Sequence, residues 1–304
     1  MYLGTKSDDG NSTTVKNILD DEIVKKGSVE VGVFEYIKKY LRLEVSDIFY
    51  TDAVIFVEGI SEVSYLKFII DTDPKLKNCH IKVYRVDGTY AHQFMALLKM
   101  LGIKTIIFTD LDIKRSKQDK EMDLEKNKIP KVITDLEIQA NSNGEKIITT
   151  NGLLIAMIKD KIGENPSRNS INEEIIKLVE DKEFLVLKKD NISIYSQGKI
   201  NGNYATSFEE SIVLTNSSGI ERDSLNKLLE KVHPKTAYFK DAAYQEEITK
   251  LSYMYQVKLS DSKSNFSTTL VFLSVTDENF KIKTPKYIQE GLEELREYFT
   301  RSDA

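Results

Sequence analysis

Four acidic residues occur in two close pairs, and each pair directly follows a short run of apolar, mostly β-branched residues. The first pair is Glu58 and Glu62, and the second is Asp110 and Asp112. Residues four apart at the start of a helix, and residues two apart in an extended segment, point to the same side, so we expect the members of each pair to face one another. If the two runs are neighbouring strands, all four carboxylates gather in one small volume.

Four carboxylates in one small volume are stable only with a compensating charge. Like charges a few ångströms apart raise each other's pKa, and a hard divalent cation with oxygen ligands removes that repulsion. Two Mg²⁺ ions about 4 Å apart can activate a water and stabilise the leaving oxygen of a phosphodiester. Taken singly, each acid is an ordinary surface residue, and Glu62 also suits a helix start. The two pairs together predict a metal site.

The residues around the acidic pairs predict a parallel α/β sheet. Apolar runs too short for helices indicate strands at 53–57, 81–86 and 105–109. Helical spacing indicates one helix after Ser61, which we interpret as its N-cap, and a second at about 90–101 that Gly102 ends. Strands that alternate with helices form a parallel sheet, whose ligands bind past the carboxyl ends of the strands. Both acidic pairs lie at such ends.

The rest of the chain divides into three regions. In chain order they are a helical lead-in at 1–50 with a helix at about 31–43, the α/β domain at 51–215 with an insertion at about 145–182, and a helical C-terminal region at 216–304. Within them we expect a charged loop at 114–131, two helices within 151–181, strands at 184–187 and 192–195, and a last amphipathic helix at about 286–299.

Composition limits the function classes. The net charge of −5 does not favour a protein that binds nucleic acid by neutralising phosphates, but bound cations exempt a metal-dependent phosphate enzyme from this argument. No apolar run approaches the roughly 20 residues that span a bilayer, so we expect no membrane association. Cys79 is the single cysteine and cannot form an internal disulfide, which favours the reducing cytoplasm.

The two acidic motifs resemble a known domain. Val57-Glu58-Gly59-Ile60-Ser61-Glu62, followed by Phe108-Thr109-Asp110-Leu111-Asp112, is similar to the TOPRIM domain shared by topoisomerases, primases and OLD-type nucleases. Further segments resemble the OLD (overcoming lysogenization defect) family in order along the chain: 49–53 before the first strand, 85–90 with Gly88, the late acidic motif 206–210, the lysine motif 262–266 and the closing segment 282–288. The likeness runs from about residue 40 to the end, and its order is more specific than any single motif.

The resemblance implies a role for each motif residue. Glu58, Glu62, Asp110 and Asp112 hold metal, and Glu209 completes the site; we regard Glu58 and Asp110 as catalytic as well. Glu210 is the alternative to Glu209, because two adjacent glutamates point to different sides of a helix.

The lysine motif supplies the remaining catalytic residue. Lys263 is expected to stabilise charge on the phosphate or to position the nucleophilic water, although outside the family context it would be an ordinary solvated lysine. The sequence departs from some relatives after Asp112, where no acid follows until Asp119, so we expect no further acidic ligand from that loop.

The resemblance implies a Mg²⁺-dependent endonuclease that nicks or cuts DNA, with two ions and with Mn²⁺ or Ca²⁺ as substitutes. Known OLD proteins join this nuclease half to an ABC-type ATPase, and the phosphate-binding motif of such an ATPase does not occur in this sequence. Gabija-type anti-phage nucleases are among the relatives, which implies a role in antiviral defence. The resemblance also suggests a helicase-like protein and further copies of the chain as possible partners.

Two other interpretations stay open at this stage. The chain could be a TOPRIM-fold interaction module that does not catalyse, or a nuclease that cleaves RNA, including tRNA. Proteins that bind single-stranded nucleic acid carry aromatic side chains on which the bases stack. The tyrosines here are too scattered along the sequence to indicate whether the substrate is DNA or RNA. A topoisomerase is not expected, because no candidate partner domain with a catalytic tyrosine is recognisable.

Overall fold

The computed structural model describes residues 2–6, 13–17, 39, 46–86, 95, 98–99, 101–115, 120–121, 129–130, 132–136, 148–163, 165–180 and 182–302. The helix expected at 31–43, the segment around Gly88 and most of the charged loop at 114–131 lie outside these residues. Among the residues described, no helix is both long and apolar enough to cross a membrane.

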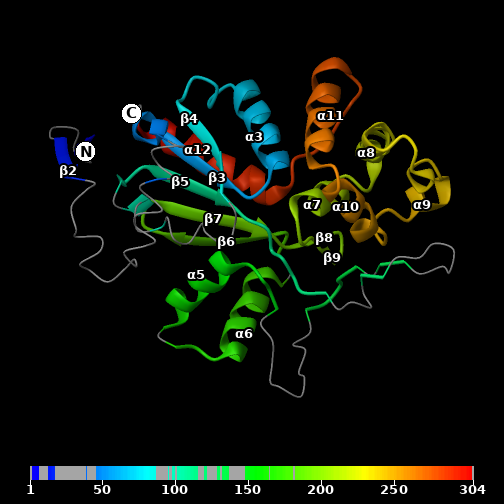
Figure 1. Cartoon of the computed structure of the whole chain (residues 1–304), viewed down its shortest axis with the longest axis horizontal. Helices are drawn as coiled ribbons and strands as arrows, with labels where there is room; N and C mark the ends of the chain where they lie inside the picture. The colour runs from blue at the N-terminus through cyan, green and yellow to red at the C-terminus, as the bar shows by residue number, and fades with distance from the viewer. Residues whose placement is uncertain are drawn as a thin grey trace.

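A five-stranded sheet forms the centre of the molecule (Figure 1). Its strands are β3 (Ala53–Val57), β4 (Ile81–Arg85), β5 (Lys104–Phe108), β6 (Phe184–Lys189) and β7 (Ile192–Gln197), in the spatial order β4-β3-β5-β7-β6. The strands β4, β3 and β5 are parallel, as the sequence predicted, and β7 is parallel to β5 as well. The edge strand β6 is antiparallel to β7, because only Asp190 and Asn191 connect them and so short a link permits only a hairpin.

The sheet separates two hydrophobic cores, and β3 contributes to both. Ala53, Ile55 and Val57 belong to one core, and Val54 and Phe56 to the other. Since successive side chains of a strand point to opposite faces, a strand covered on both sides is apolar at every position. This explains the uninterrupted apolar run before Glu58. Helices between residues 60 and 72 and between residues 208 and 302 contribute side chains to the first core, and the two helices between residues 152 and 179 contribute to the second.

The described helices occur where the sequence predicted them after residue 61, within 151–181 and at about 286–299, and others lie in the region 216–304 that was predicted to be helical. Their bounds are α3 (Ile60–Thr72), α5 (Gly152–Ile162), α6 (Arg168–Val179), α7 (Phe208–Thr215), α8 (Gly219–Val232), α9 (Ala242–Glu246), α10 (Ser252–Ser260), α11 (Lys263–Thr276) and α12 (Lys286–Ser302). The 3₁₀ helices η1 (Ser46–Tyr50) and η2 (Ala237–Phe239) and the strand pairs β1 (Tyr2–Lys6) with β2 (Thr13–Asn17) and β8 (Lys199–Ile200) with β9 (Asn203–Tyr204) complete the described elements.

One predicted cap is wrong. Helix α3 begins at Ile60, with Gly59 in the N-cap position and no side-chain cap hydrogen bond, so Ser61 lies inside the first turn. The hydroxyl of Ser61 is fully buried and bonds to residues of other helices instead, as described below. A serine in a first turn can therefore serve tertiary contacts rather than the cap.

Helix α12 is held against the sheet by a carboxylate and by a glycine. Glu294 accepts hydrogen bonds from Ser193 and Tyr195, each at 2.6 Å, and forms ion pairs with Lys104 and Lys188. Gly291 brings the helix backbone so close to the sheet that a Cβ there would lie 2.6 Å from the Phe108 ring. These contacts fix the helix across β5, β6 and β7.

The glycine contact yields a stability prediction. Gly291→Ala should lower the free energy of unfolding by about 1 to 3 kcal/mol, because the added methyl group overpacks a site bounded by the buried Phe108 ring. Gly152→Ala is the matched control, since a Cβ at this first residue of α5 meets nothing within 4 Å. Urea denaturation measures both variants, and an equally stable Gly291→Ala would contradict the close approach.

The Glu294 network predicts a pH dependence. Burial opposes the charged form, but the hydrogen bonds from Lys104, Lys188, Ser193 and Tyr195 prevail and lower the pKa of Glu294 from 4.5 to about 2. A lowered pKa in the folded state stabilises the fold above the pKa of the unfolded chain, and this contribution is lost as the pH falls toward 2. Glu294→Gln should therefore unfold at a lower temperature than the wild type at pH 7, and the difference should vanish near pH 2. A difference in melting temperature that is constant between pH 7 and pH 2 would refute this.

Candidate functional site

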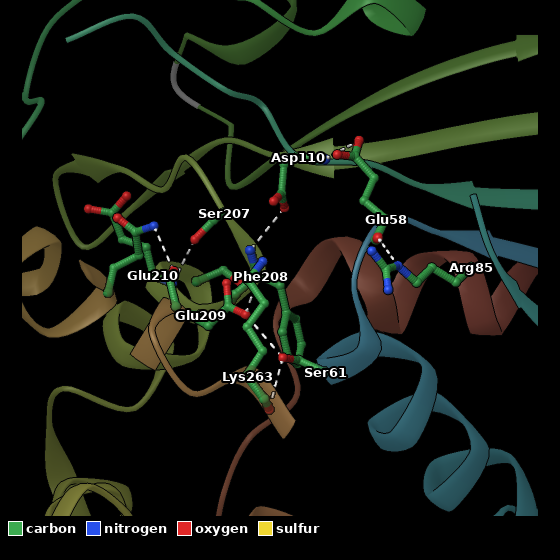
Figure 2. A network of polar contacts seen from close by, with 12 residues as sticks. Glu58, Ser61, Arg85, Asp110, Ser207, Phe208, Glu209, Glu210 and Lys263 are labelled. Carbon is green, nitrogen blue, oxygen red and sulfur yellow. Dashed lines mark hydrogen bonds and ion pairs between the residues drawn. The ribbon is translucent and has the colours of Figure 1, made fainter. Parts of the chain in front are cut away.

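The two acidic motifs meet at the carboxyl end of the sheet. Strands β3 and β5 are parallel neighbours, so the residues that follow them, Glu58 and Asp110, emerge side by side. The amide of Asp110 donates to Glu58 Oε1 at 3.2 Å. Arg85, at the end of β4 on the other side of β3, donates from Nε to the backbone carbonyl of Glu58 at 3.2 Å (Figure 2).

Glu58 is held through one of its two carboxylate oxygens. Oε1 accepts hydrogen bonds from the Thr109 hydroxyl, from the Asp110 amide and, at 3.0 Å, from Asn151 Nδ2. Burial raises the pKa of Glu58, the charge of Asp112 raises it further, and these hydrogen bonds work in the opposite direction. The side chain is therefore fixed in place while its charge is poorly compensated.

Asp110 is also held through one oxygen. Oδ1 accepts from Gln197 Nε2 at 2.9 Å and from the amide of Phe208, the first residue of α7, at 3.0 Å (Figure 2). Burial raises the pKa of Asp110 well above its ordinary value, and the nearby acids Glu58, Glu62, Glu209 and Asp112 raise it further. A helix N-terminus and an amide thus face a carboxylate that is surrounded by other carboxylates.

Glu62 returns to the site from the first turn of α3. Its side chain is 4% exposed, and its Oε2 has no hydrogen-bond partner among the described residues. Burial and the charge of Glu209 raise its pKa to about 7. A Cβ at position 59 would collide with the Glu62 carboxylate, 3.1 Å from Cδ, so the space that Gly59 leaves lets the acid fold back over the backbone.

Glu209 and Glu210 are both fully buried in the first turn of α7, but they meet different partners. Glu209 Oε1 accepts from the Ser61 hydroxyl at 3.1 Å and lies 3.6 Å from Lys263 Nζ, and its Oε2 has no hydrogen-bond partner among the described residues. Glu209 therefore keeps an unpaired oxygen beside Glu62.

Both carboxylate oxygens of Glu210 accept hydrogen bonds from protein groups. Arg115 Nη2 donates to its two oxygens at 3.2 and 3.3 Å, Ser252 donates to Oε1 at 3.0 Å, and the amide and hydroxyl of Thr206 donate to Oε2 at 2.9 and 2.8 Å. Its charge is therefore already compensated within the protein.

Lys263 is the first residue of α11, and it is half-buried. Its carbonyl accepts from the Ser61 hydroxyl at 3.3 Å, which ties the start of α11 to the first turn of α3. Burial lowers the pKa of the ammonium group, but the charges of Glu209, Asp110 and Glu62 outweigh burial and raise it. The lysine is therefore a permanent positive charge at the edge of the carboxylate cluster.

Asp112 reaches the site by a different backbone path than the sequence suggested. Its φ of 47° lies in the left-handed region, so the segment is not extended there, and the predicted alternation of Asp110 and Asp112 is wrong. The amide of Asp112 donates to the Thr206 carbonyl at 3.1 Å, and its carbonyl accepts from the Thr150 amide at 3.0 Å. Burial raises its pKa, while Lys263 lowers it. It thus belongs to the same electrostatic cluster.

The donor set fits a hard divalent cation in its chemistry. It consists of carboxylate oxygens, two of which, Glu62 Oε2 and Glu209 Oε2, are buried without a partner among the described residues. Buried acids whose pKa values are raised by their neighbours are stabilised by a bound cation. Within the described part of the chain, no three His, Cys, Asp or Glu side chains already converge on one point for an ion.

Sequence reasoning missed the neutral residues that bond to the acids. Asn151 precedes α5, Gln197 ends β7, and Thr109 stands next to Asp110, so only Thr109 lay within a motif that the sequence singled out. An Asn-Gly pair at the start of a helical pattern was the available signal for Asn151, as a cap. Asp87 and Gly88 of the segment between the two motifs lie outside the described residues.

Known protein families and sequences include relatives of this chain. Residues 49–112 match the family described as overcoming lysogenization defect protein-like, TOPRIM domain. Over 298 residues the chain is 33% identical to the endonuclease GajA of Bacillus cereus, which is 96% of this chain and 38% of that protein.

Two solved structures also resemble this chain. The C-terminal region of the Xanthomonas campestris pv. campestris OLD protein matches with a TM-score of 0.46 and 14% identity, covering 84% of this chain and 98% of that structure. The C-terminal region of the Burkholderia pseudomallei OLD protein matches with a TM-score of 0.43 and 13% identity, covering 82% and 98%. From the family match and the long alignment with GajA, we conclude that this chain carries an OLD-like TOPRIM domain, as its two acidic motifs predicted.

Proposed function

We propose that this chain is a metal-dependent nuclease that hydrolyses phosphodiester bonds of DNA. The observation that supports it most strongly is the cluster of carboxylates beside the ends of β3 and β5. Among the described residues, two of its buried oxygens lack a hydrogen-bond partner and Lys263 lies at its edge. The relative named above is called an endonuclease, and this chain spans 38% of its length. A structural role alone does not account for so many uncompensated acids in one place.

The residues divide into metal ligands and a charge stabiliser. Glu58, Glu62, Asp110, Asp112 and Glu209 would hold divalent cations, with Mg²⁺ as the natural ion and two as the expected number. When bound, the ions would activate water and neutralise charge on the phosphate. In our proposal Lys263 places its ammonium group next to the cluster, where it stabilises negative charge on the reacting phosphate.

Glu209 is the better choice for the late acidic ligand. Its Oε2 is unpaired among the described residues, whereas both oxygens of Glu210 accept hydrogen bonds, two of them from Arg115. A carboxylate that is already compensated by an arginine has little to gain from a cation. In this proposal Glu210 anchors the turn that presents Glu209.

The cellular setting belongs to the proposal as well. By its likeness to GajA and OLD proteins, we propose that the chain works in the cytoplasm in defence against phage, next to an ABC-type ATPase and in contact with a helicase-like partner or further copies of itself. The second candidate function is an interaction module without catalysis. It is favoured by the observation that no three of the described acidic, histidine or cysteine side chains already converge on an ion.

A cleavage assay separates these functions. With Mg²⁺ or Mn²⁺, the chain should nick or linearise supercoiled plasmid, and Asp110→Asn and Glu58→Gln should each lower the rate about 100-fold or more, because the site loses charge that holds the ions. Asp223→Asn, at an exposed position on α8, is the control and should cleave like the wild type. Calorimetric titration with Mn²⁺ is the second readout.

Three results would oppose the proposal. Equal cleavage by wild type and Asp110→Asn would point to a contaminant, and an absence of both cleavage and Mn²⁺ binding would favour the interaction module. Preferential cleavage of a matched single-stranded RNA would move the substrate from DNA to RNA.

The two adjacent glutamates offer a direct comparison. Glu209→Gln should abolish Mn²⁺ binding and leave the fold intact. Glu210→Gln should lower the free energy of unfolding by about 3 kcal/mol, because Arg115 then remains buried with its partner weakened. Mn²⁺ titration and urea denaturation of both variants provide the measurement. If Glu210→Gln lost the metal and Glu209→Gln kept it, the two roles would have to be exchanged.

A further inference from the structure

Gln197 has its amide orientation fixed by the protein backbone. Its Oε1 accepts a hydrogen bond from the Leu111 amide at 2.8 Å, and an amide N–H can only donate. Nε2 must therefore face the other way, where it donates to Asp110 Oδ1 at 2.9 Å and to the Tyr287 hydroxyl at 3.2 Å. The side chain is fully buried and cannot flip without losing these bonds.

Asn151 is fixed in the same manner on the other acidic motif. Its Oδ1 accepts from the Leu154 amide at 3.1 Å and thereby caps α5. Nδ2 then donates to Glu58 Oε1 at 3.0 Å and to the Thr109 hydroxyl and the Asp110 carbonyl, each at 2.7 Å. Two buried amides, each held by a backbone N–H, thus aim their NH₂ groups at the first acids of the two motifs.

The described hydrogen bonds to Glu58 and Asp110 reach only one oxygen of each carboxylate. Every hydrogen bond that the described residues donate to the two carboxylates reaches Glu58 Oε1 or Asp110 Oδ1. A carboxylate that is held by one oxygen presents the other in a defined direction. Groups that orient a ligand without touching the metal in this manner are a general requirement of metal sites.

We propose that Asn151 and Gln197 are positioning residues that hold the inner oxygens of Glu58 and Asp110 so that the outer oxygens face the cation. This inference rests on the proposed function. It adds Asn151, the N-cap residue of α5, and Gln197, the last residue of β7, to the site, although neither belongs to an acidic motif. Helix α12 also contacts Gln197, because the Tyr287 hydroxyl accepts a hydrogen bond from Gln197 Nε2.

The test compares three buried amides. Gln197→Met keeps the length of the side chain and removes its donors, and Asn151→Ser keeps a good helix cap and removes the NH₂ group. Asn216→Leu is the control, because Asn216 is fully buried and its side chain bonds to backbone groups of Ile212 and Lys283 rather than to an acid of the site. Melting temperature, Mn²⁺ affinity by calorimetry, and kcat and KM for plasmid cleavage are measured for each.

The expected results distinguish an effect on the orientation of the metal ligands from an effect on the stability of the fold. Gln197→Met and Asn151→Ser should weaken Mn²⁺ binding about 10- to 100-fold and lower kcat by a similar factor with KM for DNA unchanged. Asn216→Leu should melt at a lower temperature but bind Mn²⁺ like the wild type. If Gln197→Met fails to fold, Asn151→Ser decides alone, since its cap is retained.

Two other results would overturn the inference. Wild-type Mn²⁺ affinity in the folded variants would show that the amides do not orient the acids, and an equal loss in Asn216→Leu would reduce their role to stability. In both cases the proposed nuclease would stand. A wild-type chain that binds no Mn²⁺ would instead remove the proposed function and this inference together.

Discussion

Mutual repulsion among buried carboxylates is the constraint on which the rest of this structure depends. Burial and neighbouring charge raise the pKa values of Glu58, Glu62 and Asp110, and without compensation such a group would protonate or drive the strands apart. The parallel pairing of β3 with β5, the glycine at position 59 and the N-terminus of α7 all serve to hold these acids at one place. These three features therefore maintain an arrangement of charges that is unfavourable by itself.

The parts of the site that could be predicted from the sequence are those with a local signal. The run Ala53–Val57 predicted β3, because a strand buried on both faces is apolar at every position, and the run Ile106–Phe108 predicted most of β5. The acids of the two motifs follow these runs closely. Asn151 and Gln197 could not be found in this way. They lie 93 and 87 residues from the acids that they contact, and a polar residue at a helix start or a strand end has many ordinary explanations.

Adjacent residues of the same type can have different partners for reasons that only packing decides. Glu209 and Glu210 are identical in type and equally buried, and they differ only in the side of α7 from which they leave. One side faces Ser61 and Lys263, and the other faces Arg115 and Ser252. The left-handed backbone at Asp112 was likewise invisible in the sequence, because aspartate occurs in both conformations.

The residues of the site lie in or beside β3, α3, β5, α5, β7, α7 and α11, so they are spread over more than two thirds of the chain. During synthesis the acids of β3 and β5 leave the ribosome long before Lys263 of α11, which ties Ser61 and Glu209 together. A nascent chain therefore carries the acids before the lysine that lies 3.6 Å from Glu209 Oε1 has been added. Completion of the polypeptide through α11 is in this way a condition for placing Lys263 beside the carboxylate cluster.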